Sequence, residues 1–246
     1  MDSVNLSPTR HSLLLASNIS QRRTFIEWTL PGPAKTMSWA LMGGGRSIHR
    51  SIAWLHVNND ELGLNVCPRR FLRQQRAACE LDSRLVLMTS AYLQHVQYHV
   101  TRIDDVEAVT VATVGLGNAL RVGDAINSAG SSRKKVGTIN IGCWVNQTLS
   151  ESAMYEALSL MAEAKAVTVS DLNIRSLVSG APATGTGTDC KVLASATGGM
   201  MNRYAGKHTA VGSAIGAGVA AAVSSGVNVW LKLNQGHPVS PLASPL

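Results

Sequence analysis

The segment ATGTGTDC, residues 183–190, alternates threonine with glycine and then reaches the carboxylate of Asp189. Glycine lets the backbone approach a ligand closely, and threonine hydroxyls both donate and accept hydrogen bonds. In such a polar loop Asp189 could serve as a base or as a metal ligand. The same residues also suit a polar turn that feeds a strand over Lys191–Ala196. The segment alone leaves both interpretations open.

Four other glycine-rich or polar stretches lie at the edges of apolar runs: GGG (43–45), TVGLGNALRVGD (113–124), GTINI (137–141) and YAGKHT (204–209). If these edges converge, their backbone N–H groups and polar side chains can bind a polar ligand and move protons. The side chains of that set are Asn118, Arg121, Asp124, Asn140, Asp189 and His208. The structural alternatives are an ion pair of Arg121 with Asp124, a turn cap at Asp189 and a backbone hydrogen bond from His208.

The common nucleotide-binding and hydrolase motifs do not occur in the sequence. The nearest approach to a dinucleotide fingerprint, GLGNAL at 115–120, has leucine where the third glycine belongs. There is no G-x-x-x-x-G-K-S/T phosphate loop, no H-E-x-x-H zinc pair and no G-x-S-x-G nucleophile elbow. The sequence therefore gives no support to those classes of enzyme.

Positive charge exceeds negative charge, with 22 Lys and Arg against 15 Asp and Glu and a net charge of +7. The excess gathers in RRFLRQQR (69–76) and SSRKK (131–135). With only 2 Phe and 4 Tyr there is little aromatic surface for base stacking, and no zinc-finger spacing occurs. These segments are therefore predicted to be solvated basic faces, and no nucleic-acid partner is expected.

The four cysteines, Cys67, Cys79, Cys143 and Cys190, are far apart and form no C-x-x-C pair. Neither a zinc ribbon nor a disulfide framework is predicted, and a reducing compartment fits best, so a cytoplasmic location is expected. The first residues show no basic region followed by a cleavage site, and no signal peptide is expected.

Apolar and β-prone runs predict strands from residue 24 to residue 145 and again near residue 190. The predicted strands are Thr24–Leu30 and Lys35–Met42 on either side of a tight turn at PGP, and then Ser51–Val57, Arg84–Met88, Gln97–Ile103, Ala108–Val114, Val136–Val145 and Lys191–Ala196. The order lacks a regular βαβ alternation. The expected fold class is therefore α/β (α+β type), with one mixed or antiparallel sheet layered with helices and two long helices in the C-terminal half.

The first of these helices is predicted over Ser150–Leu172. Ser150 can cap it, and Met154, Leu158, Met161 and Lys165 fall on one stripe. No linker divides the chain, so 22–233 is expected to be a single domain, between a flexible N-terminal segment (1–21) and a disordered C-terminal tail (234–246).

The second helix raises the question of a membrane, because Ala210–Leu231 contains no charged residue and is long enough to span one. Its apolar content is mostly Ala and Gly with three serines, which is a weak transfer signal. Small residues every fourth position also let a helix pack tightly on a sheet. We therefore expect a buried helix that ends near Gly226, and no membrane span.

Five motifs, TVGLGNALRVGD, GTINI, EAKAVTVSDLNI, ATGTGTD and YAGKHT, resemble in order and separation the adenosylcobinamide amidohydrolase family of corrinoid salvage. SWALMGGG and LSESAMYEALSLMAEAKA are also similar to that family, so the resemblance covers about Arg22 to Gly226. It implies a corrinoid substrate, adenosylcobinamide, whose aminopropanol arm is released by amide hydrolysis to give adenosylcobyric acid for cobalamin salvage. A non-catalytic corrinoid-binding or trafficking protein is the alternative, and a homo-oligomer is left open.

Hydrolysis of an amide needs an activated water or nucleophile, a group that stabilises the oxyanion, and a proton for the leaving amine. Asp189, His208 and Asp124 are the predicted catalytic residues, with Cys190 as the alternative nucleophile. No cofactor or metal site is predicted, because the motifs lack the short ligand spacings that preset a zinc site. The predicted substrate-binding residues are Gly115, Asn118, Arg121, Thr138, Asn140, Thr184, Gly185, Thr186, Gly187 and Thr188.

Overall fold

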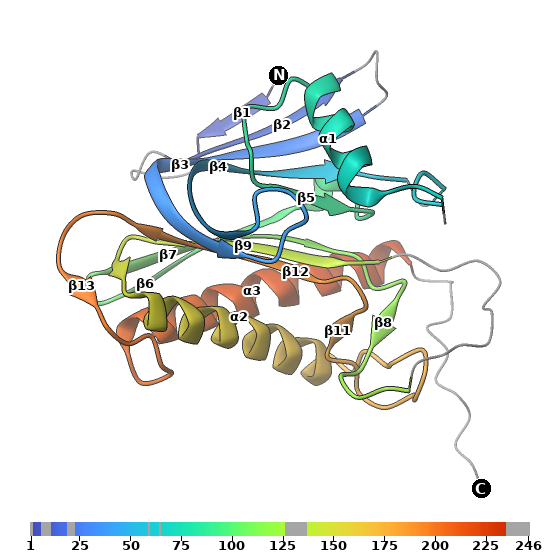
Figure 1. The fold of residues 1–246 in the computed structure, drawn as a ribbon. Coiled ribbons are helices and arrows are strands. Elements are labelled where there is room, and N and C mark those ends of the chain that lie inside the picture. Colours follow the sequence, from blue (N-terminus) through green and yellow to red (C-terminus); the bar gives the residue numbers. More distant parts are fainter. Residues whose placement is uncertain are drawn as a thin grey trace, which may run out of the picture.

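Nine strands form one mixed sheet, in which segments from the two ends of the sequence lie side by side (Figure 1). The computed structural model of the protein describes residues 2–5, 11–18, 23–58, 60–63, 65–125 and 137–234. The main path of the sheet runs β1 (Asp2–Asn5), β2 (Ser12–Asn18), β3 (Arg23–Ser38), β12 (Cys190–Ala196), β9 (Ile139–Val145), β7 (Val106–Val114) and β6 (Gln97–Ile103). Off this path β4 (Gly45–His56) pairs with β3, and β5 (Val86–Thr89) pairs with β4.

The predicted fold class, a mixed sheet layered with two long C-terminal helices, is confirmed. Within the nine-stranded sheet β9 with β12 and β4 with β5 are parallel, and the other pairs are antiparallel. The predicted strand over 97–103 has the bounds of β6, and those over 108–114 and 191–196 each lie within β7 and β12. The strand predicted from Ser51 begins earlier, at Gly45.

The tight turn predicted at PGP is wrong, because residues 31–33 lie inside the continuous strand β3. The pairing of β3 with β4 shifts register between Thr29 and Ala34, which is the mark of a bulge. A bulge leaves backbone groups outside the ladder, so two prolines without N–H groups are tolerated there. β3 therefore curves through the fold and takes part in both layers of the sheet (Figure 1).

A tryptophan-rich core separates two layers of the sheet, an upper layer that contains β4 and β5 and a lower layer formed by β6, β7, β9 and β12 (Figure 1). Trp28 of β3 and Trp54 of β4 are fully buried, with ring centroids 6.4 Å apart. Gly142 of β9 faces them from the other layer, where a Cβ atom would come within 2.9 Å of the Trp54 ring and 3.1 Å of the Trp28 ring. Glycine is needed at this position because the two rings fill the space that a side chain would occupy.

Helices α2 (Glu151–Asp171) and α3 (Ala210–Leu233) cover the opposite face of the β6, β7, β9 and β12 layer (Figure 1). The Ser150 hydroxyl caps α2 by accepting a hydrogen bond from the N–H of Ala153, as its position predicted. Met154, Met161 and Lys165 on the predicted stripe are buried. The stripe places the positively charged side chain of Lys165 against the sheet.

Helix α3 begins where expected but does not end at Gly226, and the predicted stop there is wrong. A Cβ atom at Gly226 would lie 2.5 Å from Cγ2 of Val114 on β7, so this glycine allows close packing of helix on sheet. Val211, Ala214, Val219 and Val223 are buried against the core. By length and composition α3 could also cross a membrane, and 56% of its most apolar window is buried in the fold.

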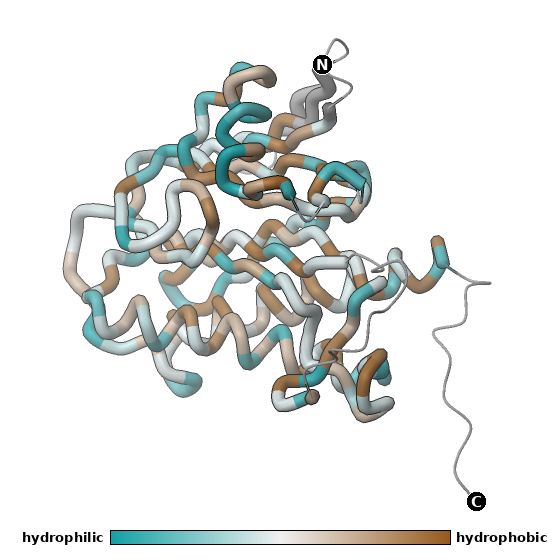
Figure 2. Tube along the Cα trace, turned by 45° about the vertical axis from the view of Figure 1, so that its right-hand side comes forward, coloured by the Kyte–Doolittle hydropathy of each residue, from teal (hydrophilic) through white to brown (hydrophobic). Residues whose placement is uncertain are grey.

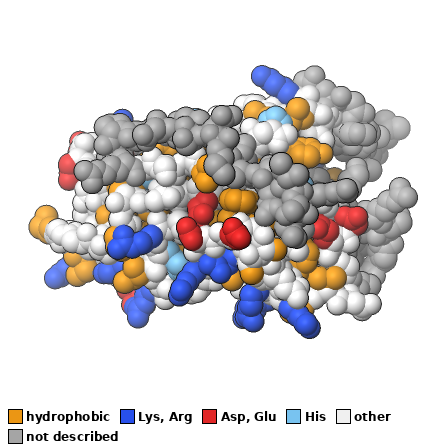
Figure 3. All heavy atoms as spheres, turned by 90° about the horizontal axis from the view of Figure 1, so that it is seen from above, with side chains coloured by type: hydrophobic (Ala, Val, Ile, Leu, Met, Phe, Trp, Pro, Cys, Tyr) orange, Lys and Arg blue, Asp and Glu red, His pale blue; other side chains and the backbone are white. Residues whose placement is uncertain are grey.

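The basic segment 69–76 forms part of helix α1 (Pro68–Ala78), which the sequence patterns did not predict. Leu72 is its one buried residue, and it packs with Leu55 and Leu81 on the outer side of the upper layer. Figure 2 shows α1 as largely hydrophilic, and Figure 3 shows Lys and Arg side chains gathered along one edge of the face above the sheet. Phe71 and Leu72 are the only large apolar residues of this segment, and its many charges led to its interpretation as a solvated basic face, so the helix was missed. The other basic segment, 131–135, lies outside the described residues.

Part of the N-terminal segment 1–21, which was expected to be flexible, belongs to the sheet. β1 pairs with β2, and β2 pairs along β3 from Ser12 with Thr29 to Asn18 with Arg23. The remaining residues of that segment, and the tail from residue 235 onward, lie outside the described residues.

Four short strands and a 3-10 turn complete the described elements. β8 (Ala119–Leu120) pairs antiparallel with β11 (Gly185–Thr186), and β10 (Thr148–Leu149) pairs parallel with β13 (Met201–Asn202). The 3-10 turn η1 covers Leu93–His95. The β8–β11 ladder ties the loop after β7 to the loop before β12.

Candidate active site

Three of the five polar stretches meet at one edge of the lower sheet layer. β9 and β12 are parallel and begin there, with Asn140 paired to Cys190, while β7 and β3 end there, with Thr113 paired to Asn140 and Ser38 paired to Val192. The segments that lead into β9 and β12 therefore lie next to each other. The β8–β11 ladder adds the segment 113–124, because Leu120 pairs with Gly185.

Asp189 occupies the centre of this edge, and its carboxylate accepts four hydrogen bonds. Oδ1 accepts from the N–H of Ile139 at 2.9 Å and from Oγ1 of Thr186 at 2.5 Å. Oδ2 accepts from the N–H of Thr186 at 3.0 Å and from Nζ of Lys165 at 2.5 Å. The Asp189 side chain is 7% exposed and that of Lys165 is 10% exposed. The two form a buried ion pair between the sheet edge and helix α2.

The glycines of the ATGTGTDC loop make this pair possible. Gly185 has φ +153°, and a Cβ atom there would lie 2.1 Å from Nζ of Lys165 and 2.2 Å from Oδ2 of Asp189. A Cβ atom at Gly187 would lie 3.1 Å from Nδ2 of Asn118. The alternation therefore has a clear physical basis, because glycine clears the space that the ion pair fills and Thr186 donates to the carboxylate.

Several of the predicted substrate-binding residues hold the loops together. Thr138 Oγ1 donates to the carbonyl of Thr188 at 3.0 Å, and the N–H of Gly115 donates to the carbonyl of Thr138 at 2.9 Å. Asn140 is buried, where Nδ2 donates to the carbonyl of Met88 at 2.6 Å and Oδ1 accepts from the N–H of Cys190 at 3.2 Å. These bonds fix the edge before any ligand arrives.

Asp124 lies on the same side of the fold but in a separate set of contacts. It accepts hydrogen bonds from Oγ of Ser176 at 2.5 Å and from the N–H of Arg121 at 2.7 Å, and the bond from Ser176 is the main cause that lowers the pKa of Asp124. Arg121 donates to the carbonyl of Pro182 at 2.9 Å, and Thr184 Oγ1 accepts from the N–H of Val122 at 2.8 Å. These contacts brace the loops that carry Asp189.

The structure does not bring His208 to the Asp189 edge. YAGKHT follows β13, and Figure 1 places β13 and the chain after it at the opposite end of the helix layer from β8 and β11. There the N–H of Ala205 donates to Glu156 at 2.6 Å, and Thr209 caps α3 by accepting from the N–H of Gly212. His208 itself is exposed. The predicted convergence is thus met by three of the five stretches, while GGG (43–45) lies on the far side of β3 from β12, with Gly45 paired to Ser38.

Lys191 is one residue at this edge that the sequence patterns did not single out. It is 3% exposed, and its Nζ lies 4.9 Å from the ring centroid of Trp39, the residue after β3. Burial, and then the charge of Lys165, lower the pKa of Lys191 to about 8. Among the described residues no hydrogen bond or ion pair of its ammonium is present. The available signal was one lysine in the apolar strand CKVLASA.

Trp39 was also missed, and it connects this buried charge to the surface. Its indole Nε1 donates to the carbonyl of Asp189 at 2.9 Å, while half of the residue is exposed. An exposed tryptophan fixed by such a bond offers a rigid flat surface for a ligand. No periodic pattern marks it in the sequence, because it follows the end of β3.

Cys190 lies beside the same edge with its thiol turned toward Ser38. Its Sγ is 3.9 Å from Oγ of Ser38, which itself donates to the carbonyl of Lys191 at 2.6 Å. Burial raises the pKa of the Cys190 thiol. A thiol held in the protonated form is a weak nucleophile.

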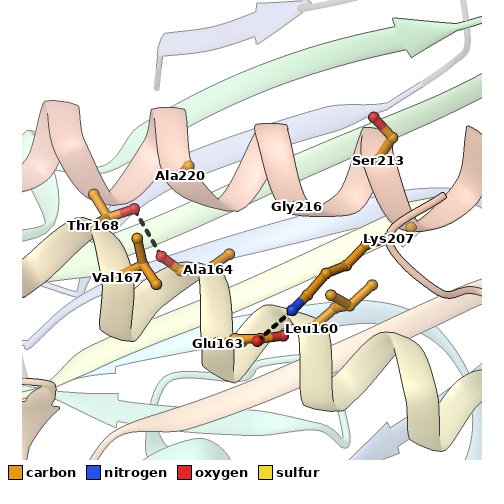
Figure 4. A pocket seen from close by; sticks show the side chains of 10 residues that line it. Leu160, Glu163, Ala164, Val167, Thr168, Lys207, Ser213, Gly216 and Ala220 are labelled. Carbon is orange, nitrogen blue, oxygen red and sulfur yellow. Dashed lines mark hydrogen bonds and ion pairs between the residues drawn. The ribbon is translucent and has the colours of Figure 1, made fainter.

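The Asp189 edge coincides with neither of two surface hollows of the fold. Within the described residues no group of three or more His, Cys, Asp and Glu side chains is placed to hold a metal ion. A groove of about 290 Å³ lies between α2 and α3, lined by Leu160, Val167 and Gly216, with Lys207 and Glu163 joined by an ion pair across it (Figure 4). A second hollow of about 500 Å³ is lined by Asp105, Arg203 and Tyr204 among others. Asp189 lines neither of them.

Almost the whole chain matches one protein family. Residues 10–235 match the family model described as Adenosylcobinamide amidohydrolase. The chain belongs to the adenosylcobinamide amidohydrolase family, and the resemblance seen in its motifs is confirmed.

Individual proteins are similar to the chain over different lengths. An uncharacterized protein of Methanocaldococcus jannaschii, MJ1613, is 30% identical over 146 residues, which are 53% of this chain and 57% of that protein. The chain thus aligns with little more than half of that relative. A Burkholderia sp. beta-aminopeptidase structure has a TM-score of 0.42 at 12% identity, over 93% of this chain and 82% of its own. The PH0078 protein from Pyrococcus horikoshii OT3 has a TM-score of 0.41 at 10% identity, over 94% and 81%.

Proposed function

We propose that the protein hydrolyses the amide that joins the aminopropanol arm to the corrin ring of adenosylcobinamide. The products are adenosylcobyric acid and aminopropanol, and the reaction serves cobalamin salvage in the cytoplasm. Membership of the adenosylcobinamide amidohydrolase family supports this reaction. The observation that carries the assignment of the site is the buried Lys165–Asp189 pair, at the point where four of the five family motifs meet: TVGLGNALRVGD, GTINI, EAKAVTVSDLNI and ATGTGTD.

A corrin ring is large and flat and carries several neutral amide side chains. Beside the buried pair, the half-exposed indole of Trp39 provides a flat apolar surface, and the threonine- and glycine-rich loops provide neutral donors and acceptors. Such a combination suits an amide-bearing ring better than a highly charged ligand. We therefore place the corrin against Trp39, with the aminopropanol amide directed toward Lys165 and Asp189.

In this site Asp189 acts by positioning rather than by taking the proton itself. Its two oxygens already accept four hydrogen bonds, which uses the lone pairs that a base would need. The carboxylate holds the Lys165 ammonium at the sheet edge, and that ammonium can stabilise the negative charge that develops on the carbonyl oxygen of the amide. His208 and Asp124 take no part in this step.

The test is direct. Purified protein is incubated with adenosylcobinamide, and mass spectrometry follows the appearance of adenosylcobyric acid and aminopropanol. Lys165→Met is the loss-of-function variant, and Lys232→Met, which removes an exposed lysine near the end of α3, is the matched control. Product from the wild type and from the control but not from Lys165→Met supports the proposal.

The alternative, a corrinoid-binding or trafficking protein, predicts a different result from the same material. Equilibrium dialysis would then show that the wild-type protein binds adenosylcobinamide, while no product forms over long incubation. That result would replace the enzymatic assignment.

A further inference from the structure

Lys191 is a buried amine that has no acidic partner of its own among the described residues. It is the second residue of β12 and is 3% exposed, in a strand whose following residues Val192, Leu193 and Ala194 are fully buried. A buried lysine is normally paired, because an unpaired ammonium loses its hydration without compensation. Lys191 instead lies against the face of Trp39, with 4.9 Å between Nζ and the ring centroid.

The charged groups around Lys191 explain why it forms no ion pair within the described residues. Lys165 faces it from α2, Asp189 from the preceding loop and Cys190 from the same strand. The Asp189 carboxylate is the only acid among these, and four other donors occupy it. The arrangement therefore places two lysines beside one carboxylate, and it assigns the carboxylate to Lys165.

We propose that Lys191 is the proton-transfer residue of the amide hydrolysis, first as general base and then as general acid. The inference rests on the proposed function. A water molecule attacks the carbonyl carbon of the substrate amide, and its proton passes to the Nζ lone pair of Lys191. The carbon–nitrogen bond then breaks, and the Lys191 ammonium returns the proton to the leaving nitrogen of aminopropanol. The net reaction consumes one water molecule and leaves Lys191 as it began.

The different surroundings of Lys165 and Lys191 explain why we assign them different roles. Lys165 stays with its carboxylate and supplies a fixed positive charge, whereas Lys191 is free to change its charge during the reaction. Burial and the neighbouring Lys165 charge hold the pKa of Lys191 at about 8, so a substantial fraction of the amine carries a free lone pair in mildly alkaline solution. Trp39, half exposed above it, connects the amine to the surface where the substrate docks.

The test compares three variants of the full chain on adenosylcobinamide across neutral and alkaline pH. Wild-type kcat/KM should rise with pH and level off above an apparent pKa of about 8. Lys191→Met removes the amine and should lower kcat roughly 10²-fold or more with KM little changed. Lys35→Met removes another lysine of the same sheet, on β3 and paired with Ser195, and should behave as the wild type.

Lys191→Arg separates a base from a simple cation. Arginine keeps the positive charge but stays protonated, so a base is lost while an oxyanion-stabilising cation is retained. We expect Lys191→Arg to be as inactive as Lys191→Met. Circular dichroism and the midpoint of urea unfolding confirm that each variant is folded.

A readout other than activity comes from carbon-13 NMR of lysine-labelled protein. The Cε signal that disappears in Lys191→Met belongs to Lys191 and should titrate with a midpoint of about 8.

Each other outcome overturns a defined part of the proposal. Folded Lys191→Met or Lys191→Arg with nearly wild-type kcat excludes Lys191 as the proton-transfer residue while leaving the proposed function standing. A Lys191 midpoint at the ordinary value of lysine excludes it as well. Absence of product from the wild type overturns the proposed function itself, and Lys191 then has no such reaction to serve.

Discussion

Lys165 and Asp189 are 24 residues apart in the sequence and meet at 2.5 Å between Nζ and Oδ2, in a place where both side chains are at least nine-tenths buried. The pair joins helix α2 to the edge of the sheet, across the loop that separates them in the chain. Whether this ion pair stabilises the fold depends on its hydrogen bonds. Burying one charge alone is costly, but two opposite charges are tolerated together when all their hydrogen-bonding groups are satisfied. The remaining three bonds to Asp189 meet that condition on the acidic side.

We expect removal of either partner to be costly. Lys165→Met leaves a buried carboxylate and Asp189→Asn leaves a buried ammonium, so each should lower the free energy of unfolding by about 3–5 kcal/mol. The double variant should lose less than the sum of the two. Urea unfolding measures all three, and Lys207→Met, which breaks the exposed pair with Glu163, is the control at about 0–1 kcal/mol. Single variants as stable as that control would show that the buried pair is not stabilised in the way described.

Stability should also depend on pH through Lys191. Its pKa is about 8 in the folded protein and 10.5 in the unfolded chain. Between these values the unfolded state binds more protons, so the Lys191 contribution to stability rises with pH from about 8 to 10.5, by at most about 3 kcal/mol. Cys143, whose pKa is raised by burial to about 12, acts in the opposite direction above 9. The difference in unfolding free energy between wild type and Lys191→Met isolates the lysine, and a difference that is flat with pH would contradict the prediction.

Two glycines of α3 should respond in opposite ways to alanine. At Gly226 the added Cβ atom meets Val114 at 2.5 Å, so Gly226→Ala should destabilise by about 1–3 kcal/mol through overpacking. At Gly216 no atom lies within 4 Å of the added Cβ, and Gly216→Ala should gain about 0.5–1 kcal/mol from lower backbone entropy in the unfolded chain. Thermal unfolding of both variants decides the matter. Equal effects would mean that α3 does not press on β7 as described.

Replacement of the one thiol at the site should be tolerated. Burial raises the pKa of Cys190, so the thiolate needed for nucleophilic attack is scarce, and the proposed route uses water instead. Cys190→Ser should therefore keep nearly wild-type turnover of adenosylcobinamide. A loss of roughly 10²-fold in kcat by a folded Cys190→Ser protein, together with a covalent acyl adduct in the wild type, would assign the attack to the thiol.

Turnover should not depend on a divalent metal ion. Among the described residues no three His, Cys, Asp and Glu side chains are grouped to hold one, and the carboxylate of Asp189 is fully engaged by protein donors. Prolonged chelation should leave kcat unchanged. Loss of activity with the chelator and its return with one divalent ion would reverse this expectation and recast the acids as ligands.

The sequence predicted those features that local patterns encode. Apolar and β-prone runs predicted β6, β7 and β12, a serine cap and an apolar stripe predicted α2, and ordered motifs predicted the family. The threonine–glycine loop pointed to Asp189, because glycines in a loop indicate that the backbone is closely approached by other groups. Lys165 was placed on the buried stripe, although its partner could not be known.

The missing parts depend on which segments meet in space. The grouping of 113–124 with 137–141 and 183–189, and the separation of His208 from them, follow from the insertion of β12 beside β9 and not from any pattern within the loops. Lys191 and Trp39 carry no periodic signal. The PGP segment reads locally as a turn, and only its pairing with β4 makes it a bulge in a continuous strand.

The position of β12 between β3 and β9 has a consequence for co-translational folding. Ser38 of β3 pairs with Val192 of β12, so one side of the completed β2–β3–β4 unit has to wait for more than half of the polypeptide to be synthesised. During that interval the open side of β3 offers unpaired N–H and C=O groups to any neighbouring chain. Crowded translation should therefore favour misassembly of nascent chains at this strand, and slow synthesis or chaperone shielding of residues 34–38 should raise the yield of soluble protein.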